Sequence, residues 1–319
     1  MLVDGEWTVD TEPYTDEDGV FDRAETTFRD WVRDDPQVRF QPDENRYHLY
    51  IARNCPWAHG AALTRRLAGL TDSVSMDIVD PWRADDGWEF TPEKDGCTAD
   101  TVNGRDYLRD VYLDADPTYT GRVTVPVLWD KREETIVNNE SIEIMRMFVT
   151  AFDEYGDEGT DLYPEEKRGA VDRIIDEIYD PINDGVYRAG FADSQRAYDT
   201  AVRELFDALD HWDTVLADQR YLAGGRLALA DVRLFPTLIR FDECYHLKFK
   251  CNRQLIHQYE HLWPYLRDVY QTPGVAETVR IDHIKDDGYF QGEITPTGPQ
   301  VDFTAPHDRD RLSGTPANN

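Results

Sequence analysis

Cys55 is the residue of this sequence with the clearest potential for chemistry. A run of aromatic and β-branched residues over 46–52 predicts a strand just before it, and helical spacing begins just after it. At a helix N-terminus, unpaired backbone N–H groups and the helix dipole favour a thiolate. We therefore expect Cys55 to have a depressed thiol pKa and a nucleophilic sulfur. Its position alone leaves open a buried and inert cysteine.

The residues that follow favour the reactive interpretation. The stretch 55–58 reads Cys-Pro-Trp-Ala, which has the frame of a thioredoxin-type C-P-x-C motif with Ala58 in place of the second cysteine. Pro56 suits the first position of a helix. Because that turn carries no resolving thiol, the chemistry has to pass through a mixed disulfide with an outside thiol.

Two further pairs of residues fit a thiol-binding site. Val125 and Pro126 interrupt a strand-like run, where a proline is acceptable at a strand start or turn, particularly as a cis peptide. In thioredoxin-like folds a cis proline lies opposite the cysteine, and the residue before it offers its backbone to a peptide-like thiol. Glu140 and Ser141 open a predicted helix, whose N–H groups and hydroxyl form an anion site. Ordinary helix capping explains the second pair equally well.

The pattern of elements predicts how these residues are positioned. Strands at 46–52 and 74–79 with a helix between them form a β-α-β unit, which implies parallel pairing. Residues 80–120 resemble a loop, and two hairpin strands at 122–129 and 135–137 follow. A helix then runs to about residue 150.

The rest of the chain has a different periodicity. Apolar residues at helical spacing predict helices around 171–178, 205–216 and 229–241, with a bend at Pro236 and shorter helical pieces over 255–284. The fold class is therefore α/β plus all-α: a thioredoxin-like domain followed by an all-helical domain. The predicted parts are an N-terminal extension over 1–45, the thiol-binding domain over 46–152, the helical domain over 160–290 and a tail over 291–319. The last residues, SGTPANN, are expected to be disordered.

Composition limits the possible functions. The net charge is −30, with 64 acidic against 34 basic residues, and this disfavours nucleic-acid binding. Because the acids are scattered, we interpret them as an adaptation to high salt, although an acidic patch for a cationic partner is an alternative. The absence of a long apolar run predicts no membrane span. Four cysteines without metal-finger spacing predict no bound metal and a reducing, cytoplasmic location.

Several stretches of the chain resemble the glutathionyl-hydroquinone reductases, the xi class of glutathione transferases. The resemblance covers roughly residues 45–290. The stretches that carry it are Tyr47–Tyr50, Asn54–His59, Asp86–Phe90, Asp116–Pro117, Tyr119, Gly121–Lys131, Ile136–Ser141, Asn183–Ala192, Leu234–Asp242, Phe249–Asn252 and Thr278–Arg280.

The resemblance implies a reaction and a set of roles. The Cys55 thiolate attacks the sulfur of a glutathionyl-hydroquinone thioether, the hydroquinone leaves, and a second thiol resolves the mixed disulfide. Tyr187 and Tyr289 are implied to meet the quinol ring and protonate it, with Tyr187 the stronger candidate. The residues implied to hold the thiol co-substrate are Trp88, Arg105, Arg122, Val125, Pro126, Glu140 and Ser141. A homodimer is expected from the family alone.

Departures from the family pattern keep some points open. Gly60 stands where the family carries arginine, and Ala228 replaces a helix-capping threonine, which leaves Asp231 unanswered at a cost of roughly 1 kcal/mol. In a halophilic source, γ-glutamylcysteine can replace glutathione as the co-substrate. Two other functions are possible, namely a glutaredoxin-like or dehydroascorbate-reducing transferase and a non-enzymatic transferase-fold binding protein.

Overall fold

The computed structural model describes residues 1–9, 15–22, 25–156 and 160–313. The chain forms two compact units, each assembled from three stretches. The first contains residues 1–12, 24–160 and 278–292, and the second contains 13–23, 161–277 and 293–319. The predicted domain limits at 46–152 and 160–290 stay predictions. The segment 278–292 nevertheless makes its contacts with the unit that carries Cys55.

A four-stranded mixed sheet forms the centre of the first unit. In spatial order its strands are β4 (Ser75–Val79), β3 (Tyr47–Ala52), β5 (Val127–Asp130) and β6 (Thr135–Asn138). Strands β3 and β4 are parallel, whereas β5 is antiparallel to both β3 and β6. All six residues of β3 are buried. The predicted β-α-β unit and the hairpin after it are thus confirmed.

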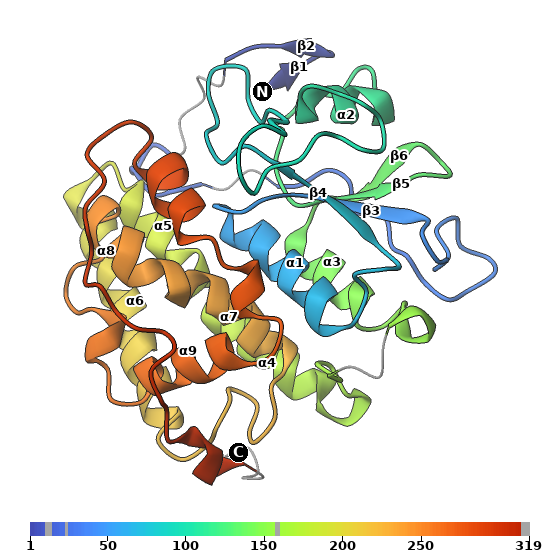
Figure 1. Cartoon of the computed structure of the whole chain (residues 1–319). Helices are drawn as coiled ribbons and strands as arrows, with labels where there is room; N and C mark the ends of the chain where they lie inside the picture. Colours follow the sequence, from blue (N-terminus) through green and yellow to red (C-terminus); the bar gives the residue numbers. More distant parts are fainter. Residues whose placement is uncertain (10–14, 23–24, 157–159, 314–319) are drawn as a thin grey trace. The chain divides into compact units, whose positions relative to one another are not determined.

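Helices cover both faces of this sheet. Helices α1 (Pro56–Leu67) and α3 (Ser141–Phe148) lie against each other on one face, and α2 (Leu108–Ala115) lies on the other (Figure 1). The two paired helices approach closely at Gly60, because a Cβ added there would lie 3.1 Å from the Met145 sulfur. An arginine at position 60 would therefore require Met145 to move.

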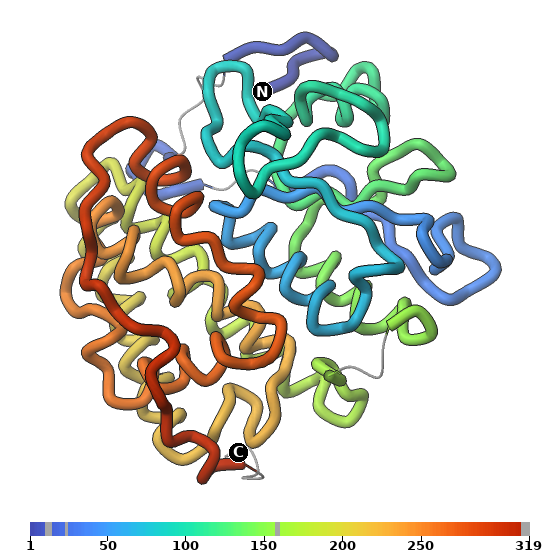
Figure 2. Tube along the Cα trace, in the orientation of Figure 1, coloured from blue at the N-terminus to red at the C-terminus, as the bar shows by residue number. Residues whose placement is uncertain are grey.

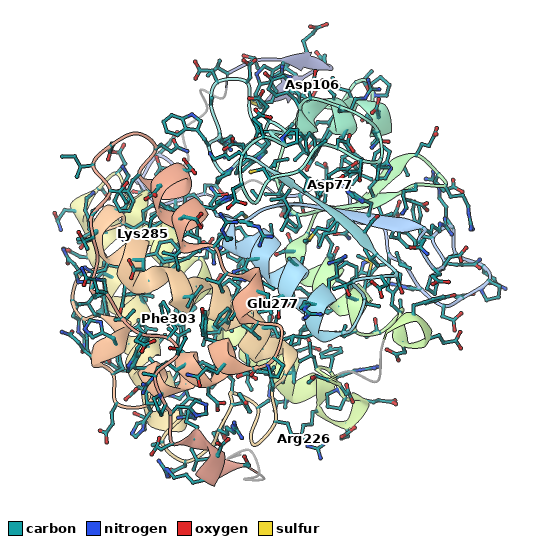
Figure 3. All side chains as sticks on the ribbon, in the orientation of Figure 1. Asp77, Asp106, Arg226, Glu277, Lys285 and Phe303 are labelled. Atoms are coloured by element: carbon teal, nitrogen blue, oxygen red, sulfur yellow. The ribbon has the colours of Figure 1, made fainter. Side chains whose placement is uncertain are left out.

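The loop predicted over 80–120 is wrong at α2. Leu108, Val111 and Tyr112 are buried at helical spacing. The apolar helical pattern is therefore present in the sequence, but it is too short to predict a helix within a polar stretch. The chain before α2 is held to the sheet by buried carboxylates. Asp77 on β4 accepts hydrogen bonds from the backbone and hydroxyl of Thr101, both at 2.7 Å, and Asp100 accepts one from Tyr50 at 2.8 Å. Figure 3 labels Asp77 at this position.

The N-terminal residues form a small hairpin of β1 (Leu2–Val3) and β2 (Glu6–Trp7). Leu2 is fully buried and exchanges backbone hydrogen bonds of 2.9 Å with Gly121. The start of the chain is thereby fixed next to the stretch that leads into β5.

The second unit is helical, as predicted. Its helices are α4 (Arg168–Ile178), α5 (Gly185–Gly190), α6 (Gln195–Val215), α7 (Leu229–Arg240), α8 (His246–Lys248) and α9 (Leu262–Gln271). Short π-helical segments connect α4 to α5 (Tyr179–Asn183) and α7 to α8 (Phe241–Tyr245). Pro236 lies inside α7, and the bend predicted there stays a prediction. No helix of the described residues is long and apolar enough to cross a membrane.

The expectation that Asp231 is unanswered is wrong. Its carboxylate accepts hydrogen bonds from the backbone N–H groups of Leu222 and Ala228, both at 2.8 Å, and from the Tyr265 hydroxyl at 2.9 Å. Ala228 supplies no side-chain acceptor in return. Two of the three donors come from outside the first turn of α7, which is why the local capping pattern could not reveal them.

The C-terminal stretch runs along the helical unit (Figure 2). Gln271 donates hydrogen bonds to the backbone of Phe303 and Ala305, at 2.9 and 2.8 Å, and the Phe303 ring packs against Trp263. Arg309 is 2% exposed, and its guanidinium donates to the backbone oxygens of Leu216, Gln219 and Arg220. Apart from Ser313, the residues predicted to be disordered at the terminus lie outside the described part of the chain.

Candidate active site

Cys55 occupies the N-cap position of α1, with Pro56 as the first helical residue. Its backbone oxygen accepts the first-turn hydrogen bond from His59 at 2.9 Å. The thiol is partly exposed, and its sulfur lies 3.6 Å from the backbone oxygen of Val125. A sulfur at this position is open to a reactant and lies next to the positive end of a helix dipole.

Val125 and Pro126 are joined by a cis peptide bond just before β5, as predicted from the interrupted strand pattern. Both residues are buried. Thr124, the residue before this pair, accepts a hydrogen bond of 2.9 Å from the Tyr112 hydroxyl through its backbone oxygen. The backbone beside the thiol is therefore contacted by the Tyr112 hydroxyl at Thr124 and by the Cys55 sulfur at Val125.

Glu140 and Ser141 stand at the start of α3, which packs against α1. The Glu140 backbone N–H donates to Asn138 at 2.7 Å, and its carboxylate accepts from Ile142 N–H at 3.5 Å. Thr26 donates to the same carboxylate at 3.3 Å. Glu140 thus caps its own helix through a long hydrogen bond, as the capping interpretation expects, and its binding role stays a prediction. Ser141 is 4% exposed.

Trp88 is 8% exposed, and among the described residues its indole N–H has no hydrogen-bond partner. Such a buried donor gains by meeting an acceptor on a ligand. The Arg83 guanidinium lies 5.9 Å from the Trp88 ring centroid. Arg83, Gly87 and Arg122 also line a cavity of about 170 Å³. Arg83 and Arg122 therefore reach one cavity, whose lining includes Gly87, the residue before Trp88.

Arg105 behaves differently from Arg122. Its guanidinium forms a two-pronged ion pair with Asp114 on α2, with N–O distances of 2.8 and 2.5 Å, and its side chain is 46% exposed. These hydrogen bonds raise the pKa of Arg105. The structure thus gives Arg105 a carboxylate of its own and places Arg122, not Arg105, at the cavity.

The two candidate tyrosines belong to different units. Tyr289 ends the π-helical segment His283–Tyr289 of the first unit. Gly288, just before it, lies against Asn54, because a Cβ added to this glycine would be 2.6 Å from the Asn54 Cβ. Tyr289 therefore follows a backbone position in contact with the residue that precedes Cys55.

Tyr187 lies on α5 in the helical unit, among other aromatic rings. Its hydroxyl is 3.5 Å from that of Tyr245, and its ring packs against Phe21, Phe191 and Phe249. The hydroxyl contact of Tyr245 with Tyr187 is not evident from the sequence. Its signal is weak, because one of 17 tyrosines in a helical stretch gives no hint that its hydroxyl meets Tyr187 across 58 residues.

The remaining cysteines differ from Cys55 in their surroundings. Burial raises the pKa of the Cys97 and Cys251 thiols, and Cys244 is fully buried. Among the described residues, none of the four cysteines forms a disulfide. Within the described residues, no group of three or more His, Cys, Asp or Glu side chains could hold a metal ion.

Comparisons with known proteins identify the family of this chain. The glutathione S-transferase N-terminal domain family matches residues 54–151, and the C-terminal domain family matches 195–268. The glutathionyl-hydroquinone reductase YqjG of Escherichia coli is 44% identical over 97% of this chain and 98% of its own length.

Solved structures extend the likeness to the whole fold. A xi-class transferase from the halophile Natrialba magadii is 58% identical, with a TM-score of 0.93 over 98% of this chain and 97% of that one. The glutathione-bound structure of YqjG is 42% identical, with a TM-score of 0.87 over 97% of this chain and 98% of that one. With its single thiol at a helix N-terminus and these relatives along nearly its full length, the chain belongs to the glutathionyl-hydroquinone reductases of the xi class of glutathione transferases.

Proposed function

We propose that this protein reduces thioether conjugates of hydroquinones, using a peptide thiol as the reductant. The observation that carries the proposal is the Cys55 sulfur, which is partly exposed at the N-terminus of α1 and lies 3.6 Å from the Val125 backbone oxygen. The other three cysteines are buried or have a raised pKa, so Cys55 alone has the surroundings of a nucleophile.

The reaction has two steps. In the first, the Cys55 thiolate attacks the thioether sulfur, a disulfide bond forms, and the bond from sulfur to the ring carbon breaks. The electron pair of that bond stays on the ring carbon, which takes a proton and leaves as the hydroquinone. In the second, a free thiol attacks the mixed disulfide, so that Cys55 is regenerated and the two thiol peptides leave as a disulfide.

Residues of the first unit are suited to bind the peptide part. The Glu140 carboxylate can meet the amino group of a γ-glutamyl residue, while the first N–H groups of α3 and the Ser141 hydroxyl can meet its carboxylate. The Val125 backbone would bind the cysteinyl part. The indole N–H of Trp88, which has no hydrogen-bond partner among the described residues, and the Arg122 guanidinium are the proposed donors for the far carboxylate.

Tyr187 and Tyr289 are the proposed proton donors for the leaving ring. A phenol hydroxyl can hydrogen-bond to developing negative charge and deliver the proton that the ring carbon needs. The hydroxyl contact between Tyr187 and Tyr245 supports this role, because a second hydroxyl can stabilise Tyr187 while its proton moves.

The identity of the thiol is part of the proposal. The co-substrate is glutathione, as bound in the YqjG structure, or γ-glutamylcysteine, which keeps the γ-glutamyl end and lacks the terminal glycine. We also propose a cytoplasmic homodimer. Four cysteines without a disulfide in the described part of the chain fit a reducing compartment, and the dimer is expected from the family. Sedimentation in molar KCl tests the dimer.

The test uses the purified full chain in molar KCl. It is incubated with a glutathionyl-hydroquinone and, separately, with the γ-glutamylcysteinyl counterpart. Release of hydroquinone and the mass of the Cys55 adduct are followed together. Cys55→Ser should abolish release, while Cys97→Ser, the control, should leave it intact. Turnover by Cys55→Ser would overturn the proposal, as would a wild-type protein that reduces only small disulfides or dehydroascorbate.

A further inference from the structure

The segment 278–292 returns to the first unit after the helical half of the chain, and charged side chains hold it there. The Lys94 ammonium lies 2.8 Å from Asp80, which follows β4, and 3.1 Å from Asp287 on the returning segment. One lysine thus joins two carboxylates that are 207 positions apart in the sequence (287 − 80). Lysine is rare here, with only six in the chain.

Other contacts support the same docking. Arg280 pairs with Asp95 at 3.0 Å, and the His283 ring lies 2.7 Å from the Asp95 backbone oxygen. Thr278 meets the His59 ring, on α1, at 2.8 Å. Gly96 leaves room for this approach, because a Cβ added there would lie 2.5 Å from the Arg280 guanidinium.

At its far end, the docked segment contacts Asn54, the residue before Cys55. Gly288 is one residue after Asp287 and lies against Asn54, whose side-chain amide donates to the Pro81 backbone oxygen at 3.1 Å. Asn54 precedes Cys55, and Tyr289 follows Gly288. The position of Tyr289 relative to the Cys55 backbone therefore depends on how firmly Asp287 is held.

We propose that Lys94 is a positioning residue, which acts by linking Asp80 to Asp287 and so holds the Tyr289-bearing segment beside Cys55. This proposal rests on the proposed roles of Cys55 and Tyr289. Burial lowers the pKa of Lys94, but the hydrogen bonds to the two carboxylates outweigh it and raise the pKa. The ammonium is thus charged throughout the range in which the thiol titrates. Arg53 and Cys97 lie within electrostatic reach of the same group of charges.

The readout is the pH dependence of Cys55 alkylation by iodoacetamide, followed by peptide mass in the full chain in molar KCl. In the docked segment we expect the Tyr289 hydroxyl to hydrogen-bond to the Cys55 thiolate, which lowers the pKa of the thiol. Lys94→Met should therefore move the midpoint of alkylation upward by roughly half a pH unit or more, and Lys94→Arg should restore most of the shift.

Two further variants separate positioning from a direct effect of charge. Asp287→Asn removes a negative charge, which through space alone would lower the midpoint, whereas loosening of the segment raises it. Gly288→Ala changes no charge and displaces the segment from Asn54, so it should also raise the midpoint. In a Tyr289→Phe background, Lys94→Met should add little.

Lys248→Met is the matched control, because Lys248 forms a surface ion pair of 2.7 Å with Glu293 in the other unit. It should leave the midpoint unchanged. Opposite shifts for Lys94→Met and Asp287→Asn, or a full shift by Lys94→Met in the Tyr289→Phe background, would overturn the positioning role. Since alkylation needs no hydroquinone conjugate, failure of this proposal is distinguishable from failure of the proposed reaction.

Discussion

At the scale of single residues, burial and neighbours decide which thiol reacts. Cys55 lies at a helix start and is partly exposed, whereas Cys251 is fully buried, with its sulfur near the backbone oxygens of Val186 and Phe249. Cys97 is partly exposed, as Cys55 is, but it lies near the Asp80 carboxylate. Its pKa is raised first by burial and then by that carboxylate, against the opposing effects of Thr91, Lys94 and Arg53.

We therefore expect selective alkylation of Cys55 at neutral pH. With a small reagent, Cys55 should be labelled first, while labelling of Cys97 should begin only as the pH exceeds the usual thiol range near 8.5. Peptide mass spectra taken over time between pH 6 and 9 measure each site separately. Protein unfolded in denaturant is the control, since all four thiols should then react alike. Labelling of Cys97 ahead of Cys55 at pH 7 would contradict the assignment.

At the scale of elements, α7 depends on a buried carboxylate at its start. Asp231 is fully buried, and desolvation raises its pKa to about 6, although the hydrogen bonds to its carboxylate act in the opposite direction. Its partners come from α9 and from the stretch before α7. The residue therefore joins three parts of the helical unit and closes one helix end.

The raised pKa gives a definite pH dependence. The folded protein binds the Asp231 proton more tightly than the unfolded chain, in which the pKa is near 3.8. The contribution of this group to stability is therefore largest below pH 4 and falls as the pH rises through 6, by an amount on the order of 2 to 3 kcal/mol.

Comparison with Asp231→Asn isolates this effect from the other acids. Between pH 4 and 7, the free energy of unfolding of the wild type should fall relative to that of Asp231→Asn, as measured by denaturant titration in constant salt. The exposed Asp193 supplies the control variant, Asp193→Asn, which should follow the wild type. Parallel curves for wild type and Asp231→Asn would show that Asp231 has an ordinary pKa in the fold.

At the scale of the whole molecule, charge is the dominant feature. The net charge is −30, so the acidic side chains repel one another in dilute buffer. The Debye length is about 10 Å at 0.1 M salt and about 3 Å at 1 M, so this repulsion is much weaker in molar salt. The 58% identical relative from a halophile supports the interpretation of this charge as an adaptation to salt. Ion pairs such as Arg46–Asp130, with both side chains buried, are screened less than exposed ones.

The melting temperature should therefore fall when KCl is lowered from molar concentration to dilute buffer. Circular dichroism melts across a KCl series measure this change. Sucrose of equal osmolality is the control, because it carries no ions and should restore less of the stability than KCl does. A melting temperature that is the same in molar KCl and in dilute buffer would argue against a salt-adapted surface.

What the sequence determined by itself was local. The strand–cysteine–proline–helix order, the interrupted strand at Val125 and the helical spacing of the second half depend on neighbours within a few turns. They therefore predicted these elements and the position of Cys55 at a helix start correctly. Helix α2 was not predicted, because only three of its residues are buried and they lie within a polar stretch.

Only the tertiary structure decided which distant residues meet. Four contacts join residues that are far apart in the chain or lie in different elements. They are those of Gly288 with Asn54, of Lys94 with Asp287, of the Tyr187 hydroxyl with the Tyr245 hydroxyl, and of Asp231 with its donors. Chain folding brings such groups together through burial of apolar surface elsewhere, and a linear pattern carries no record of the resulting distances.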